Sequence, residues 1–274
     1  MSSPTTPWIS VGDLADGFAP QAFTLPASAA LAGQRHVLHF ANGWVIEHDF
    51  DAETLRWTAR DGHSSGSAEY RASSIRDGIL LVDFLKREGG QLWSVSLVLD
   101  LSAQAFSAVL GRLPDARDVE RSLYARALAG DELTGVQVDI LHGSLDRPWQ
   151  AGACEHAPTE ELIGLRNRYR YSPSEAYEHL YLNPRFYTWQ CLQGVEQGLC
   201  DTDRAHYYRI AERLYLFIWR EKIVPTLGLV LIDLDAQRSD GKIFGYADGD
   251  FEQVSNFPVS AHCQVLDRLE PGHD

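Results

Sequence analysis

The chain of 274 residues is 45% hydrophobic and 23% charged, and its formal net charge is −14 at pH 7. A charge this negative repels phosphate, and there is no long run of Lys or Arg, so the sequence argues against a nucleic-acid partner. The chain also lacks an apolar stretch of the roughly 18–20 residues that span a bilayer, which argues against a membrane protein.

The chain start and the cysteines predict a cytoplasmic location. The first residues show no basic start followed by an apolar core, the pattern of a secretion signal. Cys154, Cys191, Cys200 and Cys263 lie far apart, without the spacing of zinc ligands. We therefore expect free thiols and no metal. Because there is no glycine-rich phosphate loop, we also expect no cofactor.

The first half of the chain has the pattern of β-strands. Apolar runs at 78–88 and 92–102 flank Gly89-Gly90, and another run follows at 106–113. Two glycines between apolar runs favour a tight hairpin turn.

A helix is predicted where the first half ends. In the segment 115–130, Val119, Leu123 and Ala127 form one apolar stripe, and Gly130 is placed to end the helix. Residues 131–150 then have the pattern of a strand followed by a loop.

The second half also has the pattern of strands. In 214–221, Tyr215, Phe217, Trp219 and Glu221 share one strand face, because successive side chains point to opposite sides. The next apolar run, a polar turn with Asp240-Gly241 and a further short run predict a hairpin.

The two halves resemble each other at a nearly constant offset. Residues 31–48 pair with 162–179, the pattern W-x4-G-x3-G recurs from Trp57 at Trp189, and 76–104 pair with 209–237. Matches in the same order in three blocks indicate a tandem duplication. We predict two homologous domains, 1–112 and 151–274, joined by a helix-containing connector, 113–150.

These runs resemble a known family. Residues 169–194 and 198–233 are similar to the C-terminal part of the MoaF (molybdenum cofactor biosynthesis protein F) family, and 39–50 to its N-terminal part. The resemblance covers roughly residues 30–260. It implies a mainly all-β fold, with two tandem lipocalin-like antiparallel β-barrels. Strands spaced at intervals of about 8–12 residues agree with barrels or sandwiches.

A more distant resemblance concerns chemistry. Tyr169-Arg170-Tyr171 with Glu178, and Trp219-Arg220-Glu221, are similar to motifs of phenolic acid decarboxylases, which are barrel enzymes that act without a cofactor. In the first domain, Leu38 and Phe40 stand where that family has tyrosines. The resemblance therefore implies an active second domain and a degenerate first one.

From these motifs we predict Glu221, Tyr169 and Tyr171 as catalytic residues. An inward carboxyl on an apolar strand has a raised pKa, which suits acid–base catalysis, and two phenols on one face can stabilise an oxyanion. Further substrate-binding candidates are the aromatic and polar residues Trp189, Trp219, Tyr187, Phe217, Asp201, His179, Glu88 and His48.

Each candidate also has a structural interpretation. Glu221 and Glu88 suit a barrel rim, the tyrosines are good strand residues, and the histidines suit structural hydrogen bonds. We interpret Asp201 and Asp203, with His206, as a turn and strand start rather than a metal site.

The sequence therefore predicts a cofactor-independent lyase, hydratase or isomerase that acts on a small aromatic or phenolic molecule. One alternative is a small-molecule binding or carrier protein of the same fold. Another is a structural partner whose barrel interior is filled by side chains. The expected partner is a small organic ligand. The sequence leaves open whether the chain forms a homodimer.

Overall fold

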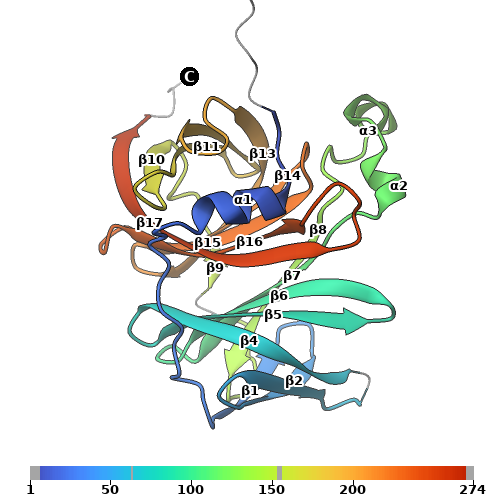
Figure 1. Cartoon of the computed structure of the whole chain (residues 1–274). Helices are drawn as coiled ribbons and strands as arrows, with labels where there is room; N and C mark the ends of the chain where they lie inside the picture. The colour runs from blue at the N-terminus through green and yellow to red at the C-terminus, as the bar shows by residue number, and fades with distance from the viewer. Residues whose placement is uncertain (1–6, 63, 153–155, 270–274) are drawn as a thin grey trace, which may run out of the picture.

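The structure, a computed structural model, describes residues 7–62, 64–152 and 156–269, and it consists mainly of β-strands. Two barrels lie one above the other in Figure 1, the first in blue to green and the second in yellow to red. No helix in the described part of the chain is long and apolar enough to cross a membrane.

Eight antiparallel strands form the first barrel. It closes because β1 pairs with β2 on one side and with β8 on the other. The strands are β1 (Arg35–Phe40), β2 (Val45–Phe50), β3 (Thr54–Ala59), β4 (Ser65–Arg76), β5 (Ile79–Glu88), β6 (Gln91–Asp100), β7 (Ala105–Arg112) and β8 (Gln137–Leu145). As predicted, Gly89 and Gly90 make the β5–β6 turn, both with positive φ.

The second barrel repeats this design. It closes through the pairing of β10 with β17 and of β12 with β13, and the short strand β9 adds to the outside of β13. The strands are β9 (Ala157–Pro158), β10 (Leu165–Arg170), β11 (Ala176–Asn183), β12 (Phe186–Gln193), β13 (Cys200–Ala211), β14 (Leu214–Glu221), β15 (Thr226–Asp233), β16 (Arg238–Tyr246) and β17 (Val254–Arg268). The predicted fold of two antiparallel β-barrels is confirmed.

The predicted helix over 115–130 is broken into two. The helices are α2 (Ala116–Val119) and α3 (Leu123–Ala129). Asp115 caps the first and Ser122 caps the second, each side chain accepting a hydrogen bond from a backbone N–H three residues on. A second cap inside the segment starts a new helix there. Gly130 ends α3 in the left-handed conformation, as expected. Strand β8, also within 113–150, completes the first barrel.

The predicted turn at Asp240-Gly241 is wrong. The β15–β16 turn lies at 234–237, where the Asp233 carboxylate accepts hydrogen bonds from the backbone N–H groups of Asp235 and Ala236. Gln237 completes the turn with a φ of 51°. Asp240 is instead buried inside β16. Its carboxylate accepts hydrogen bonds from serine hydroxyls of both barrels, at Ser73 and Ser260.

The described residues form three apolar cores. One lies inside each barrel, and the third lies between the outer faces of the two barrels. Strand β14 serves two of them, as its alternation predicts. Tyr215, Phe217 and Trp219 point into the second barrel, whereas Leu216 and Ile218 belong to the core between the barrels. The two barrels therefore pack as one body.

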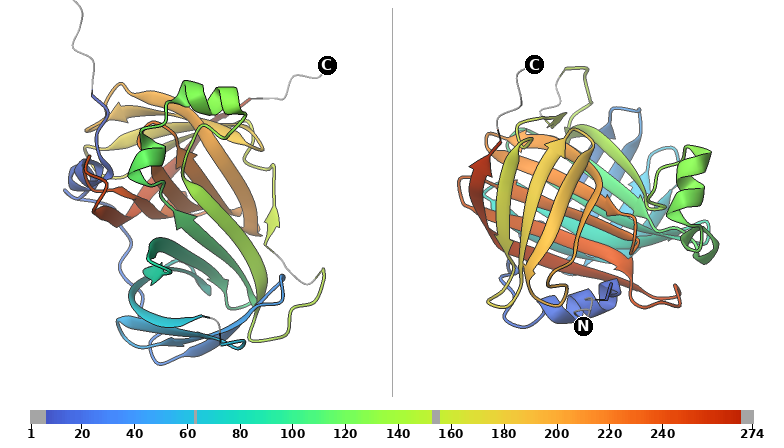
Figure 2. Two further views of the ribbon diagram at one scale, coloured as in Figure 1. Left: turned by 90° about the vertical axis from the view of Figure 1, so that its right-hand side faces the viewer. Right: turned by 90° about the horizontal axis from the view of Figure 1, so that it is seen from above.

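Helix α1 (Val11–Phe18) lies at one end of the second barrel, as the right-hand view of Figure 2 shows. It buries Val11, Leu14 and Phe18, and it contacts β16 and β17. Gly12 permits the close approach, because a Cβ there would lie 2.2 Å from the carbonyl oxygen of Ala247. The chain then runs on to the first barrel (Figure 1).

The cysteines follow the prediction where the structure describes them. Cys191, Cys200 and Cys263 are free thiols. Cys154 lies outside the described residues.

Candidate functional site

The interior of the second barrel is lined by aromatic side chains. His179 lies among them, with ring centroids 4.7 Å from Tyr169, 5.2 Å from Tyr187 and 5.8 Å from Phe217. Burial lowers the pKa of His179 to about 3, so this imidazole is neutral. In the Glu-His dipeptides of both domains, the histidines face the interior and the glutamates face outward. Here Glu178 pairs with Arg166.

Glu221 continues the inward face of β14 into this interior. Its carboxylate oxygen Oε1 accepts a hydrogen bond of 2.8 Å from Trp219 Nε1. Burial raises the pKa of Glu221 well above its usual value, and the negative charges of Asp203 and Glu196 raise it further. This environment favours the protonated form of the carboxyl, which is able to act as an acid.

Asp201 and Asp203 lie next to this carboxyl and share a lysine. Lys222 Nζ is 2.5 Å from Asp201 Oδ1 and 3.3 Å from Asp203 Oδ1. Asp203 also accepts a hydrogen bond of 3.0 Å from Trp189 Nε1. His206, on the same strand, belongs to the opposite face. The two aspartates therefore form an ion-paired cluster with Lys222, and His206 does not join them.

The predicted tyrosine pair is divided between two neighbourhoods. Burial raises the pKa of Tyr171, and the charges of Cys263 and Glu221 add to the increase. Tyr187 is also buried and also feels the charge of Glu221. The hydroxyl of Tyr169 instead lies 2.5 Å from that of Tyr181 and accepts a hydrogen bond of 3.1 Å from Asn167 Nδ2.

Two further acidic residues at this end of the second barrel, Glu175 and Glu196, were not predicted from the sequence. Tyr177 donates a hydrogen bond of 3.0 Å to Glu196 Oε2, and Val195 N–H donates one to Glu175 Oε1. Burial raises the pKa of Glu175 to about 7, and the nearby charge of Glu196 also raises it. Both glutamates lie outside the strands, so no alternation pointed to them.

The N-terminal segment covers the end of the barrel where these acids gather. Trp8 packs edge-on against Trp189 with 6.0 Å between ring centroids, and Phe18 lies 4.8 Å from Tyr171. The N-terminal segment thus packs on aromatic residues of the end where Glu221, itself partly buried, lies.

The first barrel differs because it contains a cavity of about 500 Å³. Its lining includes two of the predicted residues, His48 and Glu88. The duplication accounts for part of the space. Ile46 and Lys86, which line the cavity, stand where the second barrel has the bulkier Tyr177 and Trp219. Smaller or flexible side chains at aromatic positions leave room for a ligand.

Glu88 and Glu221 occupy equivalent positions of the repeat but differ in charge. Each accepts a hydrogen bond from the side chain two residues earlier, Lys86 at 2.9 Å and Trp219 at 2.8 Å. The hydrogen bond from Lys86 lowers the pKa of Glu88. The indole of Trp219 has no charge, and burial raises the pKa of Glu221. The same position of the repeat therefore favours the charged carboxylate in the first barrel and the protonated carboxyl in the second.

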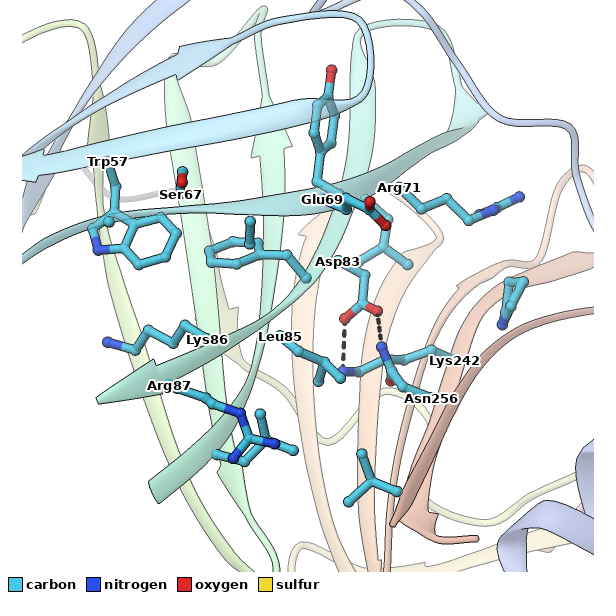
Figure 3. Close-up of a pocket in the computed structure, with 18 of the residues that line it drawn as sticks. Trp57, Ser67, Glu69, Arg71, Asp83, Leu85, Lys86, Arg87, Lys242 and Asn256 are labelled. Carbon is cyan, nitrogen blue, oxygen red and sulfur yellow. Dashed lines mark hydrogen bonds and ion pairs between the residues drawn. The ribbon is translucent and has the colours of Figure 1, made fainter. Parts of the chain in front are cut away.

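A groove of about 830 Å³ runs between the barrels, lined mainly by β4 and β5 on one side and by β16 and β17 on the other. Figure 3 shows how Asp83 reaches across it. The carboxylate of Asp83 is 2.6 Å from Lys242 Nζ and accepts a hydrogen bond of 2.6 Å from Asn256 Nδ2. These bonds tie the two barrels together.

Comparisons with known proteins agree with the predicted resemblance. Residues 6–115 match the MoaF N-terminal domain, and 156–269 match the MoaF C-terminal domain. Protein MoaF of Klebsiella aerogenes is 45% identical over 266 residues, covering 94% of this chain and 95% of that protein. A crystal structure from Burkholderia vietnamiensis, provisionally named a beta-lactamase, is similar with a TM-score of 0.33 and 13% identity, covering 39% of this chain and 96% of that one. The chain therefore belongs to the MoaF family.

Proposed function

We propose that the second barrel is a cofactor-independent acid–base site for a small organic molecule, with Glu221 as the group that transfers the proton. The observation that carries the proposal is the place of this carboxyl. It lies at one end of the aromatic core of the second barrel, hydrogen-bonded to Trp219 and near Asp203 and Glu196. Apolar surroundings strengthen its electrostatic interactions with a molecule bound at this end.

The neighbouring groups suit this chemistry. A neutral carboxyl donates its proton to a carbon or oxygen of the substrate and recovers it in a later step. Phenolic hydroxyls such as those of Tyr171 and Tyr187 donate hydrogen bonds where negative charge develops. Tyr169, whose hydroxyl is hydrogen-bonded to that of Tyr181, acts as a positioning residue for the aromatic side chains around it. The aromatic walls favour a flat substrate, and the type of reaction is a lyase or isomerase reaction.

Deuterium exchange tests the proposal without knowledge of the natural substrate. In D₂O, protonation of the terminal vinyl carbon of 4-vinylphenol, with loss of the phenolic proton, gives a quinone methide, and the reverse step removes one hydrogen from that carbon. We expect the protein to speed this exchange, followed by proton NMR. Replacing Glu221 by Gln should slow it about 100-fold or more, because the acid is lost.

Glu178→Gln is the matched control, since Glu178 lies on the outer face of the same barrel and pairs with Arg166. This variant should catalyse the deuterium exchange of 4-vinylphenol at the wild-type rate. Equal rates for the wild type and Glu221→Gln would refute the proposed role of Glu221. A wild-type rate equal to that of buffer would contradict the proposed reaction and leave a binding function.

The cytoplasmic location and the homodimer stay predictions.

A further inference from the structure

The cavity of the first barrel is a separate candidate site, in the opposite half of the molecule from Glu221. Its volume of about 500 Å³ is within the range of pockets that hold small organic ligands, about 300–1,000 Å³. Trp57, Phe84 and Trp93 supply aromatic walls, and Trp57 and Phe84 lie with ring centroids 5.5 Å apart. Walls of this kind favour a flat, largely apolar molecule.

His48 provides a buried polar group in this wall. Its Nδ1 lies 3.3 Å from the carbonyl oxygen of Ile46, and because a carbonyl only accepts, Nδ1 carries the proton. Burial lowers the pKa of the ring to about 4, so the imidazole is neutral. Nε2 is then a bare acceptor, and no partner for it is found among the described residues. A ligand with an N–H or O–H group would satisfy it.

The charges that line the cavity argue against an anionic ligand. Asp61, Glu88 and Asp139 are exposed lining residues, whereas Lys86 is the one basic side chain in the described lining. Lys86 is already paired with Glu88 at 2.9 Å. A carboxylate or phosphate that enters would meet net negative charge in a chain that is itself strongly acidic.

We propose that the first barrel binds an uncharged, flat aromatic molecule whose N–H or O–H group donates a hydrogen bond to His48 Nε2. This site is distinct from the acid–base site proposed for the second barrel. The first barrel is then a binding domain in its own right, rather than only a degenerate copy that supports the second.

Isothermal titration calorimetry of the full chain with three related compounds tests this. Indole has the proposed shape and one donor, benzothiophene has the same shape without a donor, and indole-2-carboxylate adds a negative charge. We expect indole to bind about tenfold more tightly than benzothiophene, and indole-2-carboxylate to bind more weakly than indole. In His48→Phe, the affinity for indole should fall to that for benzothiophene, because the acceptor is lost while the ring remains.

Two other variants locate the binding. Ala108 lines the cavity, and Ala108→Trp should abolish binding of both neutral compounds by filling the space. Tyr171→Phe, in the second barrel, should leave indole affinity unchanged. An equal affinity of wild type and His48→Phe for indole would overturn the proposal. So would a loss of binding in Tyr171→Phe alone, or the tightest binding by indole-2-carboxylate. Because these measurements involve no turnover, they are independent of the exchange experiment on Glu221.

Discussion

Replacing Asp83 with alanine is expected to lower the free energy of unfolding by about 3–5 kcal/mol, because the change leaves a buried ammonium without its counter-ion. Lys242 is only 2% exposed, and its Nζ lies 2.6 Å from Asp83 Oδ1 (Figure 3). The amide of Asn256 loses its acceptor in the same substitution. The damage falls at the junction of the barrels, so it should weaken both of them. Urea denaturation followed by circular dichroism measures the change.

The exposed ion pair of Arg35 and Asp49 provides the control. Its nitrogen–oxygen distance is also 2.6 Å, but the two side chains are 64% and 41% exposed. Asp49→Ala should therefore cost no more than about 1 kcal/mol. The double substitution Asp83→Leu with Lys242→Met should recover most of the stability lost in Asp83→Ala, because no buried charge remains. If Asp83→Ala and Asp49→Ala lower the free energy of unfolding by similarly small amounts, the buried ion pair contributes no more to stability than the exposed one.

Glu221→Gln is expected to make the protein more stable at neutral pH, by at least about 1 kcal/mol, while it removes the proposed activity. The unfolded chain releases the Glu221 proton near pH 4.3, the ordinary pKa of glutamate, whereas the folded protein keeps it to a much higher pH. Between these two pKa values, the wild type loses stability as pH rises. A glutamine carries no such penalty, and its side-chain oxygen still accepts the hydrogen bond of Trp219.

Denaturation curves for wild type and variant between pH 4 and pH 8 test this. The stability difference should be small at pH 4 and should grow as pH rises. Glu178→Gln should behave in the opposite way, because the hydrogen bond from Arg166 lowers the pKa of Glu178. The stability from that pair is present above the ordinary pKa of glutamate and is lost as pH falls. If Glu221→Gln is less stable than wild type at pH 7, the raised pKa of Glu221 is wrong.

The turn at residues 233–237 illustrates what local composition predicts correctly and what it does not. Asp240-Gly241 has the composition of a turn, yet Asp240 is buried between the barrels, where Ser73 and Ser260 satisfy its carboxylate. The true turn was marked by the repeat itself. Asp100 and Gln104, which align with Asp233 and Gln237, make the same turn in the first barrel, and Gln104 has a φ of 53°. Identity between the copies located a backbone requirement that composition alone misplaced.

The sequence by itself determined the duplication, the strands and the directions of their side chains. These are local properties, since alternation along a strand decides which residues share a face. The alternation in β14 predicted that Phe217, Trp219 and Glu221 share one face of the strand. In the structure, that face points into the second barrel.

Tertiary structure alone decided what surrounds each of these side chains. Glu88 and Glu221 have the same place in the repeat, but the first is exposed beside Lys86, whereas the second is enclosed among acids and rings. The cavity likewise depends on the volumes of side chains from distant strands, such as Ile46, Lys86 and Ala108. Burial, charge and empty space are sums over neighbours that meet only after folding, so no single segment of the chain specifies them.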